Sequence, residues 1–331
     1  MPDINFPINL LNVPPIVLTL ILSVFGFAIL IKFADFFVDG AASLARNLKI
    51  SGTVVGLTIV AFGTSAPELA ISFSSHLADN TDMMLGNVVG SNISNILFIF
   101  GLAILIKPFN VSKDVARKEM PLLMLMTLAL AIVLSDNLFD LTKENTISRN
   151  DGAMLVLLFS VFVYYLITII KNKDNELETE AKYKPPKAVF MTLFGLAGII
   201  FGSTLVVDNV SEFATIIGIS QKVIAVTVVS IGTSLPELVT TVTAARKGEN
   251  GMAIGNIVGS NIFNTCIVLG LPIALLGEVT TKTFNIIDVI FMIVAVALLW
   301  IFVSGHREIK KYEGVILIAT YLAYLAYVFL Q

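Results

Sequence analysis

The chain has 331 residues, of which 56% are hydrophobic and only 14% charged, and its mean hydropathy is +0.90. Soluble domains carry about 25% charged residues, so this composition excludes an ordinary cytosolic enzyme. The net charge is -3, and no run of basic residues predicts a nucleic-acid surface. The single cysteine, Cys266, cannot form an intrachain disulfide, and with only two histidines in the chain it cannot complete a closed zinc site.

Ten apolar runs, most of them near the ~20 residues that a membrane helix needs, predict an all-α polytopic membrane protein. In chain order, the predicted transmembrane helices are 16–45, 53–76, 83–106, 119–137, 150–170, 187–213, 222–246, 252–276, 285–304 and 313–330. The charged stretch 171–186 is the predicted cytoplasmic linker. It separates a first repeat, residues 1–170 with spans 1–5, from a second repeat, residues 187–331 with spans 6–10.

The loop charges predict the orientation of these spans. Sixteen of the 21 Lys and Arg residues fall in the odd-numbered connections, whereas four fall on the other side. Because cytoplasmic loops carry an excess of Lys and Arg, the odd-numbered connections are predicted inside and both termini outside. The plasma (cell) membrane is the expected location.

The sequence repeats itself at an offset of 169 residues. Residues 63–69, GTSAPEL, align with residues 232–238, GTSLPEL, and residues 86–95, GNVVGSNISN, align with residues 255–264, GNIVGSNIFN. Each half has an odd number of predicted spans, so the second half enters the membrane inverted. Two inverted five-helix repeats are typical of secondary transporters, whose substrate sites lie near the bilayer midplane.

Glu68 and Glu237 lie in the middle of predicted spans, where an ionisable side chain is costly and indicates a functional site. Pro67 and Pro236 precede them and break the helical hydrogen bonding, which frees backbone carbonyls one turn from each carboxylate. Two other interpretations remain open at this point. The glutamates could be protonated and join helices through hydrogen bonds, and Pro67 could mark a simple kink.

Hydroxyl and amide side chains accompany both glutamates. Thr64, Ser65, Thr233 and Ser234 lie three or four residues before a glutamate and share its helix face where the helix continues. Four further side chains lie in pairs four residues apart on the third and eighth spans: Ser91, Asn95, Ser260 and Asn264. Plain packing through the neighbouring G-x-x-x-G pairs is the alternative for this second group.

Carboxylate, carbonyl and hydroxyl oxygens suit a hard cation, and calcium takes six to eight oxygens in a flexible cage. Two ionised glutamates carry a charge that one calcium or two sodium ions would neutralise. The ions are therefore expected as transported substrates, with no cofactor. Asp39 is expected to pair within its own helix or to cap it.

These paired motifs resemble the two alpha-repeats of the calcium/cation antiporter superfamily, specifically its sodium/calcium exchanger branch. The resemblance covers essentially the whole chain. It implies four clustered cation sites between the second, third, seventh and eighth helices, with Glu68 and Glu237 bridging them. It also implies that the first and sixth helices slide to switch access, and that potassium is not co-transported because residue 264 is Asn.

Position by position, the resemblance assigns Thr64, Ser65 and Ser91 to the inner side, Thr233, Ser234 and Ser260 to the outer side, and Asn95 and Asn264 to the middle. The backbone carbonyls of Ala61 and Ser230 match further ligand positions. The expected function is calcium/sodium antiport, and proton/calcium exchange through the same glutamates is the alternative. The expected partners are these ions and membrane lipid, with no obligatory protein partner. No nucleotide-binding loop or catalytic constellation predicts an enzyme.

Overall fold

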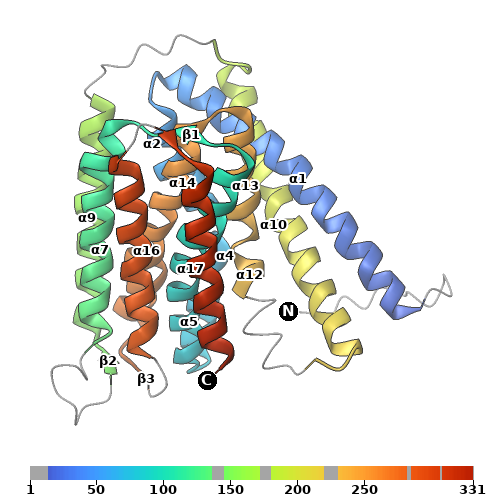
Figure 1. Ribbon diagram of the computed structural model, residues 1–331, viewed down its shortest axis with the longest axis vertical. Helices are drawn as coiled ribbons and strands as arrows, with labels where there is room; N and C mark the ends of the chain where they lie inside the picture. Colours follow the sequence, from blue (N-terminus) through green and yellow to red (C-terminus); the bar gives the residue numbers. More distant parts are fainter. Residues whose placement is uncertain are drawn as a thin grey trace.

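A computed structural model describes residues 14–135, 145–171, 180–219, 230–281, 285–305 and 308–330. Within these ranges the chain is almost entirely helical (Figure 1). Seven of the described helices are long and apolar enough to cross a membrane, and an eighth span results if one bent pair of helices counts as a single crossing. The prediction of an all-α membrane protein is confirmed.

The first half begins with the 34-residue helix α1 (Pro15–Leu48). A broken span follows, and a long helix then runs from α5 through a π-helical segment into α6. The remaining elements of this half complete the order α2 (Gly52–Val55), η2 (Gly56–Val60), α3 (Ala61–Thr64), α4 (Ala66–Leu77), α5 (Thr81–Ser94), η3 (Asn95–Phe100), α6 (Gly101–Ile106), β1 (Phe109–Asn110), η4 (Val115–Glu119), α7 (Met120–Val133), β2 (Asn145–Ile147) and α9 (Arg149–Lys171).

The second half begins with the 32-residue helix α10 (Pro185–Ile216). Its other described elements are α12 (Ser230–Thr233), α13 (Leu235–Lys247), α14 (Asn250–Phe263), η6 (Asn264–Leu269), α15 (Gly270–Leu276), β3 (Val279–Thr281), α16 (Ile286–Gly305), β4 (Glu308–Ile309) and α17 (Lys311–Phe329). The bounds of α5 and η3 recur in α14 and η6 at the offset of 169 residues that relates the two halves in sequence.

Some predicted boundaries were wrong. Helix α10 begins at Pro185 and not at residue 187, because proline suits the first turn of a helix. The second span is divided at Ser65, where the proline prediction places a break. The fourth span begins within η4 and its predicted end, 136–137, lies outside the described residues. Residues 222–229 of the seventh span and residues 172–179 of the linker also lie outside them.

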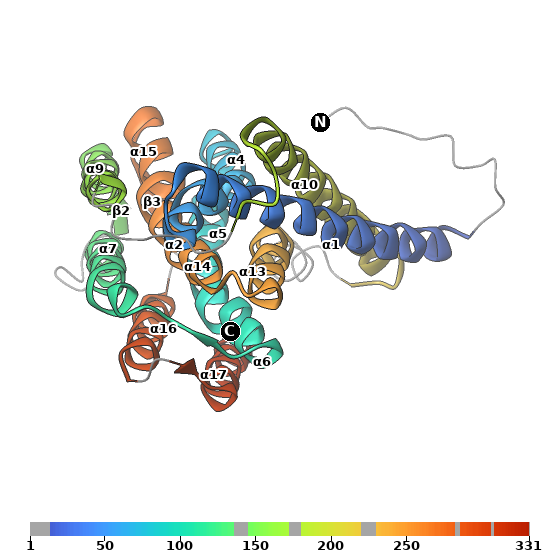
Figure 2. The same ribbon diagram turned by 90° about the horizontal axis from the view of Figure 1, so that it is seen from above.

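Helices α1 and α10 lie side by side and lean away from the rest of the bundle (Figures 1 and 2). Glycines bring their backbones together: a Cβ on Gly40 would lie 2.5 Å from the backbone nitrogen of Thr192, and one on Gly195 would clash with the backbone of Phe37. No side chain fits between the helices at these points. The two longest helices therefore form one closely packed pair.

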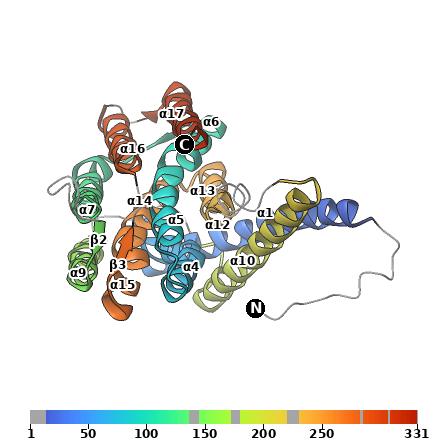
Figure 3. The ribbon, with the colours of Figure 1, turned by 90° about the horizontal axis from the view of Figure 1, so that it is seen from below.

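The other helices form a bundle around α5 and α14, which lie near its centre in the view from below (Figure 3). Two short antiparallel ladders join the halves, β1 with β4 and β2 with β3. They lie at opposite ends of the bundle (Figure 1). The buried core residues of α5 and α14 include Val88, Ile93, Ile257 and Ile262, so the centre of the bundle excludes solvent around the broken helices.

Candidate cation site

Both predicted helix breaks are present. The helix stops at Ser65 (φ -86°, ψ 8°) and at Ser234 (φ -87°, ψ 5°), and new helices start at Ala66 and Leu235. Pro67 lies in the first turn of α4 and Pro236 in the first turn of α13, where the missing N–H costs nothing. The first break bends the chain by 44°. The proline prediction is thus confirmed at equivalent positions of both halves.

Glu68 and Glu237 lie in the first turns of the helices that follow these breaks, and their exposed fractions are 1% and 0%. The positive end of each helix dipole favours a negative side chain there. The two carboxylates are close enough to repel each other electrostatically. Two like charges buried together require a cation or protons to balance them.

The hydrogen bonds of the two carboxylates differ. The Ser65 hydroxyl donates to Glu237 Oε1 at 2.9 Å. Among the described residues, Glu237 Oε2 and both carboxylate oxygens of Glu68 have no hydrogen-bond partner. Three buried carboxylate oxygens are therefore available as ligands. Buried polar atoms are normally hydrogen-bonded, so this concentration marks a binding site.

A first group of oxygens surrounds Glu237. Thr64 and Ser260 are close to its carboxylate, and both are fully buried. The Thr64 hydroxyl also lies 3.1 Å from the carbonyl of Val60 and 3.2 Å from Oδ1 of Asn256. Within the described structure Ser260 Oγ has no hydrogen-bond partner. Residues from both halves thus meet at this carboxylate.

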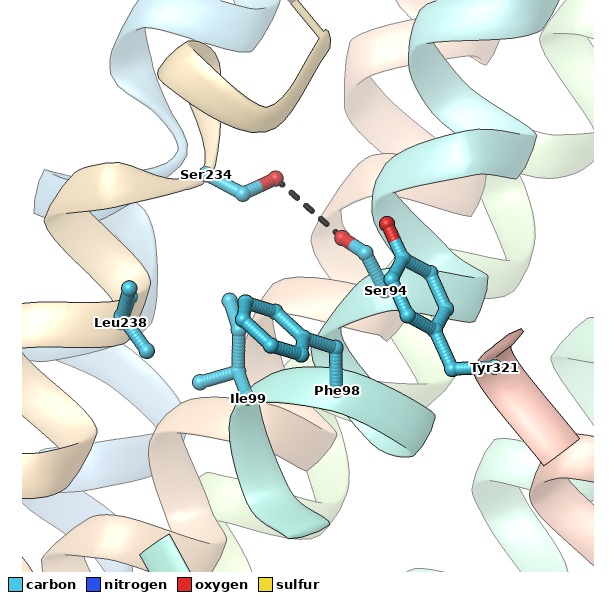
Figure 4. Close-up of a pocket in the computed structure, with 6 residues that line it drawn as sticks. All are labelled: Ser94, Phe98, Ile99, Ser234, Leu238 and Tyr321. Atoms are coloured by element: carbon cyan, nitrogen blue, oxygen red, sulfur yellow. Dashed lines mark hydrogen bonds between the residues drawn. The ribbon is translucent and has the colours of Figure 1, made fainter. Parts of the chain in front are cut away.

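A second group consists of the hydroxyls of Ser91, Ser94 and Ser234. The Ser234 hydroxyl lies 3.4 Å from that of Ser91 and 3.5 Å from that of Ser94, the second contact being drawn in Figure 4. All three side chains are buried. Ser91 therefore contacts Ser234, a residue that the resemblance places on the opposite side of the site.

Asn95 and Asn264 occupy equivalent positions at the beginning of η3 and η6. Both are buried, and neither the oxygen nor the nitrogen of either side-chain amide has a hydrogen-bond partner among the described residues. Single-turn π segments inside α-helices occur frequently at functional sites. Buried polar atoms are normally paired, and these two amides are exceptions to that rule, like the two glutamates.

The remaining predicted ligands are less informative. The Ala61 carbonyl accepts a hydrogen bond of 3.0 Å from the Ser65 backbone nitrogen and a longer one of 3.4 Å from the Thr64 hydroxyl. Ser230 begins α12, but its side chain lies outside the described residues. Thr233 is 7% exposed and ends the same short helix. The structure places both at the second helix break.

The packing alternative for the third and eighth spans holds for one pair of glycines. A Cβ on Gly255 would lie 2.5 Å from the Thr53 carbonyl, and one on Gly259 would lie 2.7 Å from Cβ of Ala61. Gly86 and Gly90 have no such neighbour within 4 Å in the described part of the chain. Close helix packing at two glycines and the buried, unpartnered hydroxyl of Ser260 thus occur together on α14 in the described structure.

Sequence reasoning missed three residues of the site. Asn256 accepts the Thr64 contact and donates to Thr241 at 2.9 Å, and Asn87 donates to the backbone carbonyl of Glu68 at 3.2 Å. Ser94 joins the second hydroxyl group. Asn87 and Asn256 belong to the repeated G-N-x-x-G-S-N pattern, but the pattern does not distinguish an amide that contacts a candidate ligand residue from one that only packs helices. Ser94 lies outside that pattern.

The donor set suits a hard cation. Across the described ranges, no three His, Cys, Asp or Glu side chains cluster as a soft-metal or multi-carboxylate site would require. Cys266 is buried, and its sulfur lies 3.6 Å from the sulfur of Met126. Two carboxylates with neutral hydroxyl and amide oxygens remain, and calcium and sodium bind such oxygens.

Ion pairs connect α1 to the rest of the molecule at the end near the linker. Asp39 contacts Lys182 Nζ at 2.5 Å and Lys247 Nζ at 2.7 Å, and Lys247 also contacts Asp35 at 3.1 Å. We call these four residues the α1–α13 network. The expectation that Asp39 pairs within its own helix was wrong, because its partners come from the segment before α10 and from α13.

Comparison with known proteins gives a consistent result. Residues 18–168 and 187–330 match the family model described as "Sodium/calcium exchanger protein". The inner membrane protein YrbG of Escherichia coli is 33% identical over 92% of this chain and 95% of its own length. The sodium/calcium exchanger MaX1 of Methanosarcina acetivorans is 32% identical over 92% and 96%. A solved structure of the sodium-calcium exchanger NCX_Mj has a TM-score of 0.80 and 28% identity, and covers 94% of this chain and 98% of that one.

Proposed function

The chain belongs to the sodium/calcium exchanger family, and we propose that it exchanges calcium for sodium across a membrane by alternating access. One observation carries this proposal. Glu68 and Glu237, from two halves related by sequence, are buried together at equivalent helix breaks, and three of their four oxygens have no partner in the described structure. The family's transport function agrees with this arrangement, and an enzyme activity is not part of the proposal.

The proposed architecture is ten transmembrane helices in two inverted five-helix repeats, residues 1–170 and 187–331, joined by the cytoplasmic linker 171–186. The recurrence of α5–η3 in α14–η6 supports it, as do the ladders at opposite ends of the bundle. The loop charges support an orientation with both termini outside, and the plasma membrane is the proposed location. In this orientation the α1–α13 network lies at the cytoplasmic end.

The proposed ligands are Glu68 and Glu237 with the hydroxyls of Thr64, Ser65, Ser91, Thr233, Ser234 and Ser260, the amide oxygens of Asn95 and Asn264, and the carbonyls of Ala61 and Ser230. The contacts favour grouping these residues around each carboxylate across the halves. Thr64, Ser65 and Ser260 form a set with Glu237, and Ser91 joins Ser234. We propose this grouping in place of the inner and outer sets that the resemblance implies.

Calcium and sodium compete for the same oxygens because both are hard cations. The two carboxylates carry a charge of -2 when ionised, which one calcium or two sodium ions balance. Each state that is fully loaded with one kind of ion thus avoids an uncompensated charge in the membrane, which would cost several kcal/mol. A half-loaded site retains that cost, which favours coupled exchange over leakage.

The decisive experiment uses purified protein in sodium-loaded vesicles. Dilution into sodium-free buffer with radioactive calcium is expected to drive calcium uptake, and vesicles loaded with choline are expected to show none. Proton/calcium exchange, which the family comparison does not favour, is tested in parallel vesicles with only a pH gradient. Uptake that follows the pH gradient and ignores sodium would contradict the proposed coupling ion. Uptake without any counter-ion would indicate a channel.

A further inference from the structure

The two halves differ at one position next to the site. Ser94 ends α5, and the residue 169 positions later, at the end of α14, is Phe263. Phe263 is buried, and its ring packs against those of Phe62 and Phe159, with centroids 5.1 Å and 6.0 Å away. Where the second half fills this position with an aromatic ring, the first half has a hydroxyl.

A small cavity lies on the Ser94 side. It measures about 10 Å³ and is lined by Ser94, Phe98, Ile99, Ser234, Leu238 and Tyr321 (Figure 4). A volume of roughly this size accommodates one water molecule, provided that two or more polar groups can bind it. Ser94, Ser234 and Tyr321 supply three hydroxyls. The other three lining residues are apolar.

The hydroxyls around this cavity are only loosely bonded to one another. Ser94 Oγ lies 3.5 Å from Ser234 Oγ and 3.3 Å from the Ser91 carbonyl, and Ser234 Oγ lies 3.4 Å from Ser91 Oγ. Hydroxyl hydrogen bonds are usually 2.7–2.8 Å long. Contacts this long leave the hydroxyls free to turn toward a better partner. By contrast, the Ser65 bond to Glu237 is 2.9 Å.

Tyr321 is held in place by its ring. It is 7% exposed and stacks on Phe98, with centroids 5.3 Å apart and an interplanar angle of 23°. Tyr321 belongs to α17, and its stacking on Phe98 of η3 fixes the phenol at the cavity. Its hydroxyl needs a polar partner at this depth in the membrane.

We propose that Ser94, Ser234 and Tyr321 bind one water molecule in this cavity, and that this water is an oxygen ligand of the cation held by Ser91 and Ser234. The identity of the cation rests on the proposed exchange function, whereas the water site rests on the cavity and its hydroxyls alone. Ser94 and Tyr321 are positioning residues that act through the water. At the equivalent position of the second half Phe263 replaces the hydroxyl with an aromatic ring, so the proposal places a water ligand on one side of the site only.

The proposed water should affect calcium binding more than sodium binding. Calcium takes six to eight oxygens, more than a protein cage of hydroxyls and shared carboxylates easily provides, so it benefits most from an added water. Losing the water is therefore expected to weaken calcium binding more than sodium binding. A merely structural role for Ser94 would change both affinities together, or would change the melting temperature.

The test combines Ser94→Phe, which copies the second half and fills the cavity, with a double-mutant cycle of Ser94→Ala and Tyr321→Phe. Calcium binding to the purified protein is measured by calorimetry, and half-saturating calcium and sodium are measured in vesicles. Ser94→Phe is expected to raise half-saturating calcium about fivefold and sodium less than about twofold. Each single substitution of the cycle should cost about threefold, and the double variant should cost no more, because both remove the same water. Ser94→Thr, which retains the hydroxyl, should bind calcium with the wild-type affinity.

Ser160→Ala on α9 is the matched control, since that hydroxyl bonds only to its own helix at Leu157. Additive effects in the cycle, or a folded Ser94→Phe protein with unchanged calcium affinity, would overturn the inference. If Ser94→Phe does not fold, the cycle alone decides. Wild-type protein that shows no sodium-dependent uptake would contradict the proposed function instead, and calorimetry would still test the water site.

Discussion

The Ser65 hydroxyl donates a hydrogen bond of 2.9 Å to the Glu237 carboxylate, which belongs to the other half of the chain. Ser234, the equivalent of Ser65, instead contacts Ser91, and both oxygens of Glu68 have no partner in the described part of the molecule. The two halves are thus similar in sequence but not in their contacts. An alternating-access transporter requires such inequality, because its two ends cannot be open at the same time.

Glu68→Gln and Glu237→Gln should each abolish sodium-dependent calcium uptake while the protein still folds. Each substitution retains the shape of the side chain and removes one of the two charges that balance the cation. Uptake is measured in sodium-loaded vesicles, and folding by melting temperature in detergent. Glu212→Gln, at an exposed position of α10, is the control and should transport normally. Full uptake by either site variant would rule out the paired-carboxylate site.

Ser65→Ala should weaken cation binding about tenfold. The Glu237 carboxylate loses the 2.9 Å hydrogen bond from the Ser65 hydroxyl, and a hydrogen bond to a charged group is worth about 1.5–3 kcal/mol. Half-saturating calcium and sodium are both measured, and both should rise because Glu237 serves either ion. Ser74→Ala, on the helix α4 that follows Ser65, removes an exposed hydroxyl that bonds to Ile71, and it should change neither value. Equal behaviour of the two variants would contradict a ligand role for Ser65.

Lys247→Gln should favour opening at the end of the molecule that carries the α1–α13 network. Lys247 contacts both Asp35 and Asp39 and so ties α1 to α13. Loss of this tie should lower the half-saturating calcium concentration measured from that side by about two- to threefold, since partly exposed ion pairs contribute up to about 1 kcal/mol. Lys118→Gln, which breaks an exposed pair with Asp114, is the control. An unchanged value for Lys247→Gln would show that the network does not restrain α1.

The ion pair between Lys182 and Asp39 should not respond to pH between about 6 and 9. The hydrogen bond from Lys182 to Asp39 raises the pKa of Lys182 above its ordinary value of about 10.4. A raised lysine pKa stabilises the folded state at every pH below the ordinary value, and this contribution is lost only as the pH rises through the raised one. Transport by wild type and by Lys182→Gln should therefore show pH profiles of the same shape in this range. Profiles that diverge below pH 9 would contradict this.

Gly195→Ala should destabilise the pair of helices α1 and α10. The added methyl group would clash with the backbone of Phe37, which cannot move as a side chain does. Overpacking of this kind costs about 1–3 kcal/mol. The melting temperature in detergent and the exchange rate should both fall. Gly305→Ala, at a position with no neighbouring atom within 4 Å in the described structure, should have little effect. A Gly195→Ala protein with a normal melting temperature and exchange rate would show that α1 and α10 can move apart to accommodate the added methyl group.

The sequence predicted the features that depend on composition and on proline. Apolar runs predicted the membrane helices, and Pro67 and Pro236 predicted the breaks at Ser65 and Ser234. It could not predict the π segments that begin at Asn95 and Asn264, because no residue type specifies a π turn. Nor could it predict which hydroxyl meets which carboxylate. These contacts depend on how the halves fit together, and a repeated motif is equally compatible with either grouping.

The backbone contacts between α1 and α10 have a mechanical consequence. With no side chain between them at Gly40 and Gly195, neither helix can shift sideways without carrying the other. If alternating access moves α1, α10 would therefore move with it as part of one rigid body. A single rigid-body step would then change access on both sides of the membrane, and no separate signal between the two sides would be needed.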